Sequence, residues 1–396
     1  RAAAKYITGT MGKKLAFYIL MFCFTLVLLE VLAFAVVQLV DAKDFFDSRE
    51  GVYAQFSDVS LADFKSNGAD AVTGWRSFGP RVQEEENCLG AVVESTYDAV
   101  GARIYSGFDS RNSEIVVVGD SYTNGEEAND DETFPARLSQ ILGISVANHG
   151  VGGYGPTQSV LNLQQNISRY PEVKVVVLAI MYENVHRMVN GYRPVLYHGS
   201  SNYTLKPYMA AGQIVSHPGT EAFDSVKQFT AATEPAFEND FWAKPKATFP
   251  YSVALFRSLS SNYFHYRKLQ RAFRKAGKPE FFLSFDDPEI QLNLIALLNQ
   301  FAVVAREWGV KPVVVFIPRN SLDTSSAGSF IAQRRSELDS SLVIGDVAEF
   351  EGVDWINFNL REAEGDNTCH PSPYGYNIIA QYIAQLLRRS EVAPGL

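Results

Sequence analysis

The sequence predicts an α/β domain with a parallel sheet, preceded by one transmembrane helix and interrupted by a large insertion. Short apolar runs at Ile115–Val118, Val173–Ile180 and Lys311–Ile317 are typical of strands buried on both faces of a parallel sheet. Helical patterns alternate with these runs, which indicates right-handed crossovers and helices on both faces. A long apolar stretch, Leu15–Val40, precedes all of them.

Composition limits the classes of function. The chain has 396 residues, of which 46% are hydrophobic and 20% are charged, so it is able to bury a full-sized core and is expected to form one large domain with additions. The formal net charge is −9 and no long cluster of Lys and Arg occurs. Phosphate neutralisation needs concentrated basic charge, so no nucleic-acid partner is expected.

The apolar stretch Leu15–Val40 is 26 residues long, and Glu30 is its only residue charged at neutral pH. It exceeds the roughly 20 residues that cross a bilayer. A cleaved signal peptide is the alternative, but its apolar core is usually only about 7 to 15 residues long. Basic residues precede the stretch and acidic residues are frequent after it, so the positive-inside rule places the N-terminus in the cytoplasm and the main domain outside. For a bacterial cell this means a single-pass protein of the inner membrane with a periplasmic domain.

Glu30 lies near the middle of this predicted span, where an ionised carboxylate is costly and usually faces protein or a polar cavity. It therefore motivates the hypothesis of a membrane protein partner for the helix. The alternative is a protonated Glu30 that faces lipid or the headgroup region.

Two of the three cysteines follow the predicted span. Cys23 lies within the membrane stretch, which leaves Cys88 and Cys369 on the outer side. Because two thiols in an oxidising compartment are a natural pair, we predict a disulfide between Cys88 and Cys369.

The chain divides into seven segments. A cytoplasmic N-terminus (1–14), the transmembrane helix (15–40) and a membrane-proximal segment (41–110) come first. The first half of the α/β domain (111–190), an insertion (191–287), the second half of the domain (288–390) and a C-terminal tail (391–396) follow. Met11 precedes Gly-Lys-Lys and is a plausible translation start, in which case residues 1–10 are an upstream extension.

The α/β elements follow in order. Aromatic residues in the membrane-proximal segment indicate a part that docks on the domain. The elements predicted in the first half are strands at 115–118, 144–148 and 173–180 with helices at 133–142 and 156–169. Those predicted in the second half are helices at 290–308 and 373–389 with strands at 311–317 and 353–358. Pro at the start of three of these helices suits a first helical turn.

The insertion breaks this alternation for nearly a hundred residues. It is rich in aromatic residues, with a possible hairpin at 203–215 and helical patterns at 221–242 and 251–276. Such excursions in α/β enzymes often shape a substrate site, so we interpret it as a lid or as a packing element that braces the domain against a partner.

The first strand runs directly into Gly119-Asp120-Ser121. A glycine allows a sharp turn, an aspartate can cap the following helix, and ligands bind beyond the carboxyl ends of parallel strands. A hydrophobic strand followed by Gly-Asp-Ser resembles the first block of the SGNH (GDSL-type) hydrolase family. The resemblance implies a flavodoxin-like three-layer sandwich and a nucleophilic role for Ser121.

Two later segments are similar to the family's oxyanion-binding blocks. In the run from Asn148 to Gly155, the spacing of the motif makes Gly153 the match, whose backbone N–H would help to hold the oxyanion. Asn184 matches the Asn of the third block, although the Gly and Asp that usually flank it are absent. The resemblance thus implies an oxyanion hole formed by the N–H groups of Ser121 and Gly153 and the amide of Asn184.

The last block of the family is matched by the segment from Asp366 to Gly375, which leads into an apolar helix. His370 is implied as the general base. Most relatives have Asp three residues before this His, but Asn367 stands there and Asp366 lies one residue further back. Either Asp366 reaches the imidazole, or His370 and Ser121 act as a dyad oriented by a backbone carbonyl.

The resemblance implies a membrane-anchored serine esterase or O-acyltransferase acting on esters of cell-envelope carbohydrate, since relatives with this plan often serve polysaccharide modification. Some act beside a membrane-bound O-acyltransferase, which would suit Glu30. The alternative is an accessory or structural subunit of a membrane complex that has kept the fold and lost activity. No cofactor is implied, and no metal is expected because His149, His186, His198, His217 and His265 show no metal-ligand spacing.

Overall fold

Five parallel strands form the central sheet of the molecule. The computed structural model describes residues 2–40, 45–197, 203–275, 285, 287–319, 326–361 and 368–390. The sheet has the order β11-β10-β7-β5-β6, with every neighbouring pair parallel. Its strands are β5 (Ser113–Gly119), β6 (Ser145–Gly150), β7 (Val175–Met181), β10 (Lys311–Ile317) and β11 (Val343–Asp346). In chain order this is the 2-1-3-4-5 arrangement of flavodoxin-like sheets, as predicted.

Alternate residues of each strand enter two separate cores. In β5, Val116 and Val118 belong to one core cluster, whereas Ile115 and Val117 belong to the other. The first face is covered by α7 (Pro156–Asn166) and α13 (Pro288–Glu307), and the second by α6 (Phe134–Leu142) and α15 (Pro373–Arg389). Because both faces are buried, the strands are apolar throughout, and this explains why they were recognisable in the sequence.

The predicted strand at 353–358 is wrong. The fifth strand of the sheet is β11, which pairs with β10, while residues 353–358 form turns. Gly352 has a φ of +77°, and the Asp354 carboxylate accepts a hydrogen bond from the Ile356 N–H at 3.0 Å. These contacts stabilise a turn, although apolar side chains of the segment still pack on the core.

Short elements complete the two halves of the α/β domain. In the first half these are α5 (Ser121–Asn124), α8 (Val185–Met188) and the 3-10 helices η1 (Ser110–Asn112), η2 (Asp130–Glu132), η3 (Ile167–Arg169) and η4 (Tyr182–Asn184). In the second half they are α14 (Ser326–Arg334), η8 (Arg335–Glu337), η9 (Val347–Glu349), β12 (Asn359–Arg361) and β13 (Thr368–Pro371).

The membrane-proximal segment docks on the insertion, as its aromatic residues predict. The Phe56 ring stacks on Tyr203 with centroids 4.9 Å apart, and the Tyr53 ring lies edge-on to Phe237 at 5.8 Å. The elements of this segment are α3 (Arg49–Tyr53), α4 (Asp58–Asn67), β1 (Ala69–Asp70), β2 (Gly74–Trp75), β3 (Arg81–Glu86) and β4 (Val92–Tyr97). The segment is therefore part of the folded body.

In its described residues, the insertion contains the predicted hairpin and three longer helices instead of two. Its elements are α9 (Arg193–Leu196), β8 (Tyr208–Ala210), β9 (Gln213–Val215), η5 (Thr220–Ala222), α10 (Val226–Asn239), α11 (Tyr251–Leu259) and α12 (Asn262–Lys275). The helix predicted at 251–276 is broken after Leu259, where the Ser261 hydroxyl accepts the Phe264 N–H at 3.2 Å and starts a new helix.

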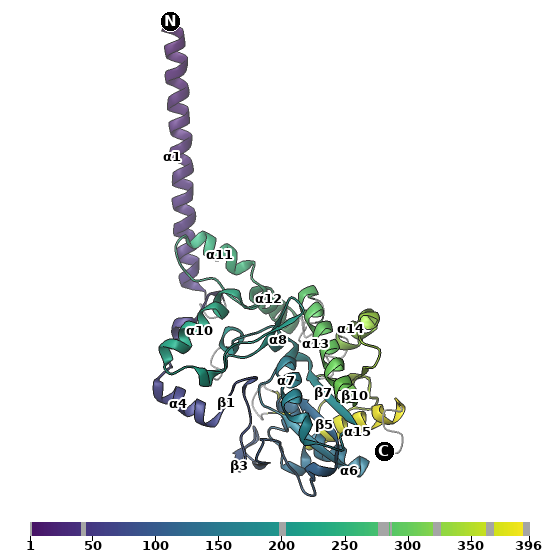
Figure 1. Ribbon diagram of the computed structural model, residues 1–396. Coiled ribbons are helices and arrows are strands. Elements are labelled where there is room, and N and C mark those ends of the chain that lie inside the picture. The colour runs from purple at the N-terminus through teal and green to yellow at the C-terminus, as the bar shows by residue number, and fades with distance from the viewer. Residues whose placement is uncertain are drawn as a thin grey trace.

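Helix α1 (Ala2–Leu39) projects from the folded body over most of its length (Figure 1). Two helices in the described residues are long and apolar enough to cross a membrane: Lys13–Leu39 within α1, and α13, which is mostly buried in the core. By composition alone, Lys13–Leu39 is compatible with a membrane span or with a signal sequence. The Glu30 carboxylate of α1 has partners within this chain. It accepts hydrogen bonds from the backbone of α11, with the Tyr251 nitrogen at 2.7 Å. The predicted partner thus loses part of its motivation and stays a proposal.

Candidate active site

The topology of the sheet brings Ser121 and Asn184 to one edge. Ser121 begins α5 just after β5, and Asn184 ends η4 just after β7. Strands β5 and β7 are neighbours. After β5 the chain continues to β6 at one edge of the sheet, and after β7 it continues to β10 toward the other edge. Sheets of this order bind ligands in the crevice at this switch point.

Close packing fixes the turn that carries Ser121. A Cβ at Gly119 would lie 2.0 Å from Thr123 Oγ1, and one at Gly150 would lie 2.0 Å from the Asn124 nitrogen. Only glycine therefore allows β5 and β6 to approach α5 this closely. Asp120 caps the turn by accepting the Tyr122 N–H at 2.8 Å. The serine is held at the sheet edge with 7% of its surface exposed.

The Asn184 side chain meets the residue before the serine. Its amide nitrogen donates a hydrogen bond to the Asp120 carboxylate, and its Oδ1 is buried without a partner. Burial raises the pKa of Asp120 to about 6, although the charge of Arg187 acts in the opposite direction. Asn184 is thus close to the nucleophile turn, as the oxyanion role requires, with one of its two N–H donors engaged.

Gly153 lies beneath an arginine that the sequence analysis did not identify. Gly153 has a φ of +79°, and a Cβ there would lie 1.8 Å from Arg193 Nη1. Burial lowers the pKa of Arg193 to about 10, with a smaller contribution from the charge of Arg187, and its Nε has no hydrogen-bond partner. A guanidinium therefore stands beside the predicted oxyanion glycine and adds positive charge to this part of the site.

His370 lies between two glutamates. It belongs to β13, which pairs with β12. Its Nε2 is 3.2 Å from Glu126 Oε2, its Nδ1 is 3.6 Å from Glu127 Oε1, and its backbone N–H donates to Glu127 Oε2 at 3.1 Å. Asp366, predicted to orient the imidazole, lies outside the described residues.

Among the described residues, Glu127 is the carboxylate beside His370 Nδ1. Both glutamates follow Ser121 by five and six residues in the same loop, and Glu127 has a φ of +66°, which is unusual for a residue with a side chain. The sequence offered one signal for them, two adjacent carboxylates just after the nucleophile turn. Their relation to His370 arises only in the folded chain.

His370 lies beside the turn that carries Ser121. The His370 ring contacts Tyr122 edge-on at 5.7 Å, so the imidazole lies beside the residue that follows the serine. Within the described residues, no hydrogen bond joins Ser121 to His370. Glu126, which is more exposed than His370, interacts with the Nε2 that would accept the serine proton. A change of the Glu126 rotamer would free that nitrogen, and catalytic hydrogen bonds are often long before substrate binds.

The glutamates determine the pKa of His370. Burial alone would lower this pKa, but the Glu127 and Glu126 carboxylates outweigh it and raise the pKa above the ordinary value. A general base is active when it is deprotonated, so kcat/KM for an ester should decrease as the pH is lowered. Because the pKa of His370 is raised, this decrease should begin at a higher pH than it would for an ordinary histidine. The Glu126→Gln variant should shift this limb to lower pH, measured with 4-nitrophenyl acetate. Glu172→Gln, at an exposed glutamate, is the control, and an unmoved limb in Glu126→Gln would contradict the assignment.

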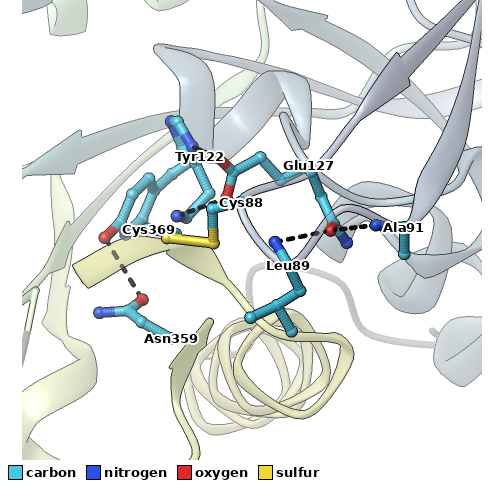
Figure 2. Close-up of a disulfide and its surroundings, with 9 residues drawn as sticks. Cys88, Leu89, Ala91, Tyr122, Glu127, Asn359 and Cys369 are labelled. Carbon is cyan, nitrogen blue, oxygen red and sulfur yellow. Dashed lines mark hydrogen bonds and ion pairs between the residues drawn. A yellow bond between two sulfur atoms is a disulfide. The ribbon is translucent and has the colours of Figure 1, made fainter. Parts of the chain in front are cut away.

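The predicted disulfide between Cys88 and Cys369 is present, with Cα atoms 6.4 Å apart. Figure 2 shows it next to Glu127 and Tyr122, and Cys369 directly precedes His370. It ties the turn between β3 and β4 to the strand of the candidate base. The two cysteines and Glu127 lie close enough together to hold a metal ion, but sulfurs joined in a disulfide are not thiolate ligands.

Removal of this disulfide should affect both stability and activity. Cys88→Ser with Cys369→Ser is expected to lower the free energy of unfolding by about 2–5 kcal/mol, because the bond restricts the unfolded chain. Ester hydrolysis should fall as well, since β13 loses its tie beside His370. Thermal unfolding and kcat of the double variant test this. Cys23→Ser, at a free cysteine of α1, is the control, and activity equal to the parent would contradict the second part.

Comparison with known proteins gives distant similarities. No family model matches the sequence, and no curated protein matches it. Among solved structures, it is similar to a protein described as lipolytic and of the G-D-S-L family from Desulfitobacterium hafniense, with 13% identity, a TM-score of 0.31, and coverage of 70% of this chain and 100% of that one. It is also similar to an acetyl xylan esterase from Butyrivibrio proteoclasticus, with 9% identity, a TM-score of 0.31, and coverage of 73% and 66% respectively.

Proposed function

We propose that this chain is a membrane-anchored serine esterase or O-acyltransferase of the SGNH type. The observation that carries the proposal is the position of His370, held by two carboxylates beside the Asp120–Ser121–Tyr122 turn at the switch point of the sheet. A serine, a histidine with a raised pKa and a carboxylate at its Nδ1 are the parts that acyl transfer needs.

In the proposed reaction, Ser121 Oγ attacks the carbonyl carbon of an ester while His370 Nε2 takes its proton. The tetrahedral oxyanion is stabilised by the Ser121 and Gly153 N–H groups, the Asn184 amide and the nearby Arg193 guanidinium. The C–O bond to the alcohol then breaks, and the leaving oxygen takes the proton from His370. Water or a sugar hydroxyl, deprotonated by His370, then attacks the acyl-enzyme, the acyl–Oγ bond breaks, and His370 returns the proton to Ser121 Oγ.

We further propose that the esters belong to cell-envelope carbohydrate and that the domain works at the outer face of a bacterial inner membrane. The anchor-plus-domain plan and the distribution of basic residues before Leu15 support this location. A membrane-bound O-acyltransferase is the proposed class of partner for α1, most of which is uncovered by the rest of the chain.

The test is covalent labelling of the full-length protein with a fluorophosphonate probe. We expect one labelled site that disappears in Ser121→Ala and persists in Ser106→Ala, which changes an exposed serine elsewhere. If the parent is labelled, a separate sample that has not been treated with the probe is assayed for acetate release from acetylated polysaccharides. Absence of labelling in a protein with a cooperative thermal transition would reject the proposal.

The second candidate function is an accessory subunit that has kept the fold without turnover. The observation that favours it is the interaction of His370 Nε2 with Glu126 in place of Ser121. If Glu126 blocks the base permanently, Glu126→Ala should gain labelling that the parent lacks. Equal labelling of the two proteins would remove the support for this candidate.

A further inference from the structure

Helix α11 of the insertion is fixed against α1. The Glu30 carboxylate accepts hydrogen bonds from the Tyr251 and Ser252 N–H groups, at 2.7 and 3.3 Å, and from the Ser252 hydroxyl. A carboxylate at a helix N-terminus is favourable because the first N–H groups lack partners within the helix. Nearby, the Phe34 ring packs on Tyr251 at 5.0 Å. Figure 1 shows α11 beside the end of α1 that joins the folded body.

This contact determines the depth of α11 if α1 spans a membrane, as the proposed function holds. The apolar stretch Leu15–Val40 is about 39 Å long at 1.5 Å per residue, whereas the hydrocarbon core is about 30 Å thick. Counted from Leu15, about 20 residues cross that core, which ends close to Phe34. Glu30 then lies about one helical turn inside the outer boundary, and the start of α11 lies at the same depth.

The side chains of α11 and the residues before it fit this location. Phe249 and Phe256 are 71% and 72% exposed, and Val253 is 43% exposed. Val253 and Phe256 are three residues apart in α11 and therefore share one side of the helix, and Phe249 precedes its first turn. Ala254 and Ser258 are buried and belong to the opposite side, which faces α1 and the folded body. Aromatic side chains in such numbers on an exposed face indicate a partner or a membrane.

A basic cavity adjoins this apolar face. Its volume is about 640 Å³, and it is lined by Lys244, Lys246 and Arg257 together with Phe249 and Val253. Arg49 and Glu238 also line it and form an ion pair at 3.6 Å, and Lys244 is buried over the Tyr263 ring, so its exposed charge comes from Lys246 and Arg257. Lys246 and Arg257 are exposed. Apolar side chains next to exposed cations match the acyl chains and phosphates of one lipid leaflet.

We propose that Phe249, Val253 and Phe256 insert into the outer leaflet beside α1, with the adjoining basic cavity receiving the headgroup of an anionic phospholipid. The chain would then contact the membrane through α1 and through the start of α11, and the hydrogen bonds of Glu30 would connect these two contacts. The domain would be held at a fixed height above the bilayer. A single flexible tether would not do this.

The experiment uses the full chain in nanodiscs of phosphatidylcholine and phosphatidylglycerol with brominated acyl chains. Phe249→Trp and Phe256→Trp are compared with Ile356→Trp, a control at a site that is 70% exposed in the second half of the domain. The fluorescence of the parent, which has four Trp residues, is subtracted. We expect at least twofold stronger quenching at positions 249 and 256 than at 356, and weaker quenching when Lys246→Gln and Arg257→Gln are added to Phe256→Trp.

Equal quenching at positions 256 and 356 would overturn the inference. Protection of Phe256→Trp from aqueous iodide without quenching by lipid would also overturn it, in favour of a protein partner. Leu26→Trp tests the membrane anchor separately. Quenching at position 26 without quenching at positions 249 and 256 would reject only the proposed location of α11. Absence of quenching at all three positions would reject the membrane anchor as well. Fluorophosphonate labelling of the same samples reports on the proposed activity independently.

Discussion

Replacing His370 by alanine is expected to lower kcat for an acetyl ester by about four to six orders of magnitude. In the proposed mechanism the imidazole takes the Ser121 proton and returns it to the leaving alcohol, and loss of a triad histidine has an effect of this size in serine hydrolases. The rate with excess free imidazole should recover in part, because a small base can occupy the vacated space. Steady-state kinetics with and without imidazole measure both effects.

The fold should survive this substitution. The His370 side chain is 25% exposed, and its backbone N–H makes the hydrogen bond to Glu127 whatever the side chain. We therefore expect a melting temperature within a few degrees of the parent. His265→Ala, at an exposed histidine of α12, serves as the control. A kcat within tenfold of the parent in His370→Ala would show that the general base is another group.

The strands were predictable because their burial on both faces leaves little choice of residues. Val175–Met181 is apolar at every position, and this pattern predicts a strand buried on both faces. The fifth strand failed this test because Val343–Asp346 is short and includes Gly345, which the Tyr382 side chain covers, and an aspartate. The apolar pattern of segment 353–358 favours a strand more than that of β11 does, although Gly352 and Asp354 turn the chain there.

The candidate site was predictable where the chemistry follows a strand end, as for Ser121 and Asn184. The glutamates around His370 were not predictable, because Glu127 and His370 are 243 positions apart in the sequence and only the fold brings them together. The same limit applies to Glu30, whose partners in α11 lie 221 and 222 residues later in the sequence. Local pattern indicates that a polar group needs a partner without saying where in the chain it lies.

Replacing Asn184 by leucine is expected to lower kcat by about 10²- to 10³-fold with little change in KM, as for other amide donors in oxyanion holes. The loss should be in the chemical step, because the amide binds an oxygen that carries charge only in the transition state. Measured kcat and KM for an acetyl ester test this. Asn162→Leu, at a buried asparagine on α7 whose amide binds the His149 carbonyl, is a control for loss of a buried amide elsewhere.

The hydrogen bond from Asn184 to Asp120 offers a competing explanation, in which the amide only holds the nucleophile turn. A double-mutant cycle separates the two. Asp120→Asn keeps a cap for the Tyr122 N–H and removes the carboxylate that Asn184 binds. If Asn184 is an oxyanion donor, Asn184→Leu should cost about 10²-fold or more in kcat in the Asp120→Asn background too. If it acts only through Asp120, that cost should disappear there, and a lowered melting temperature of Asn184→Leu alone would account for its defect.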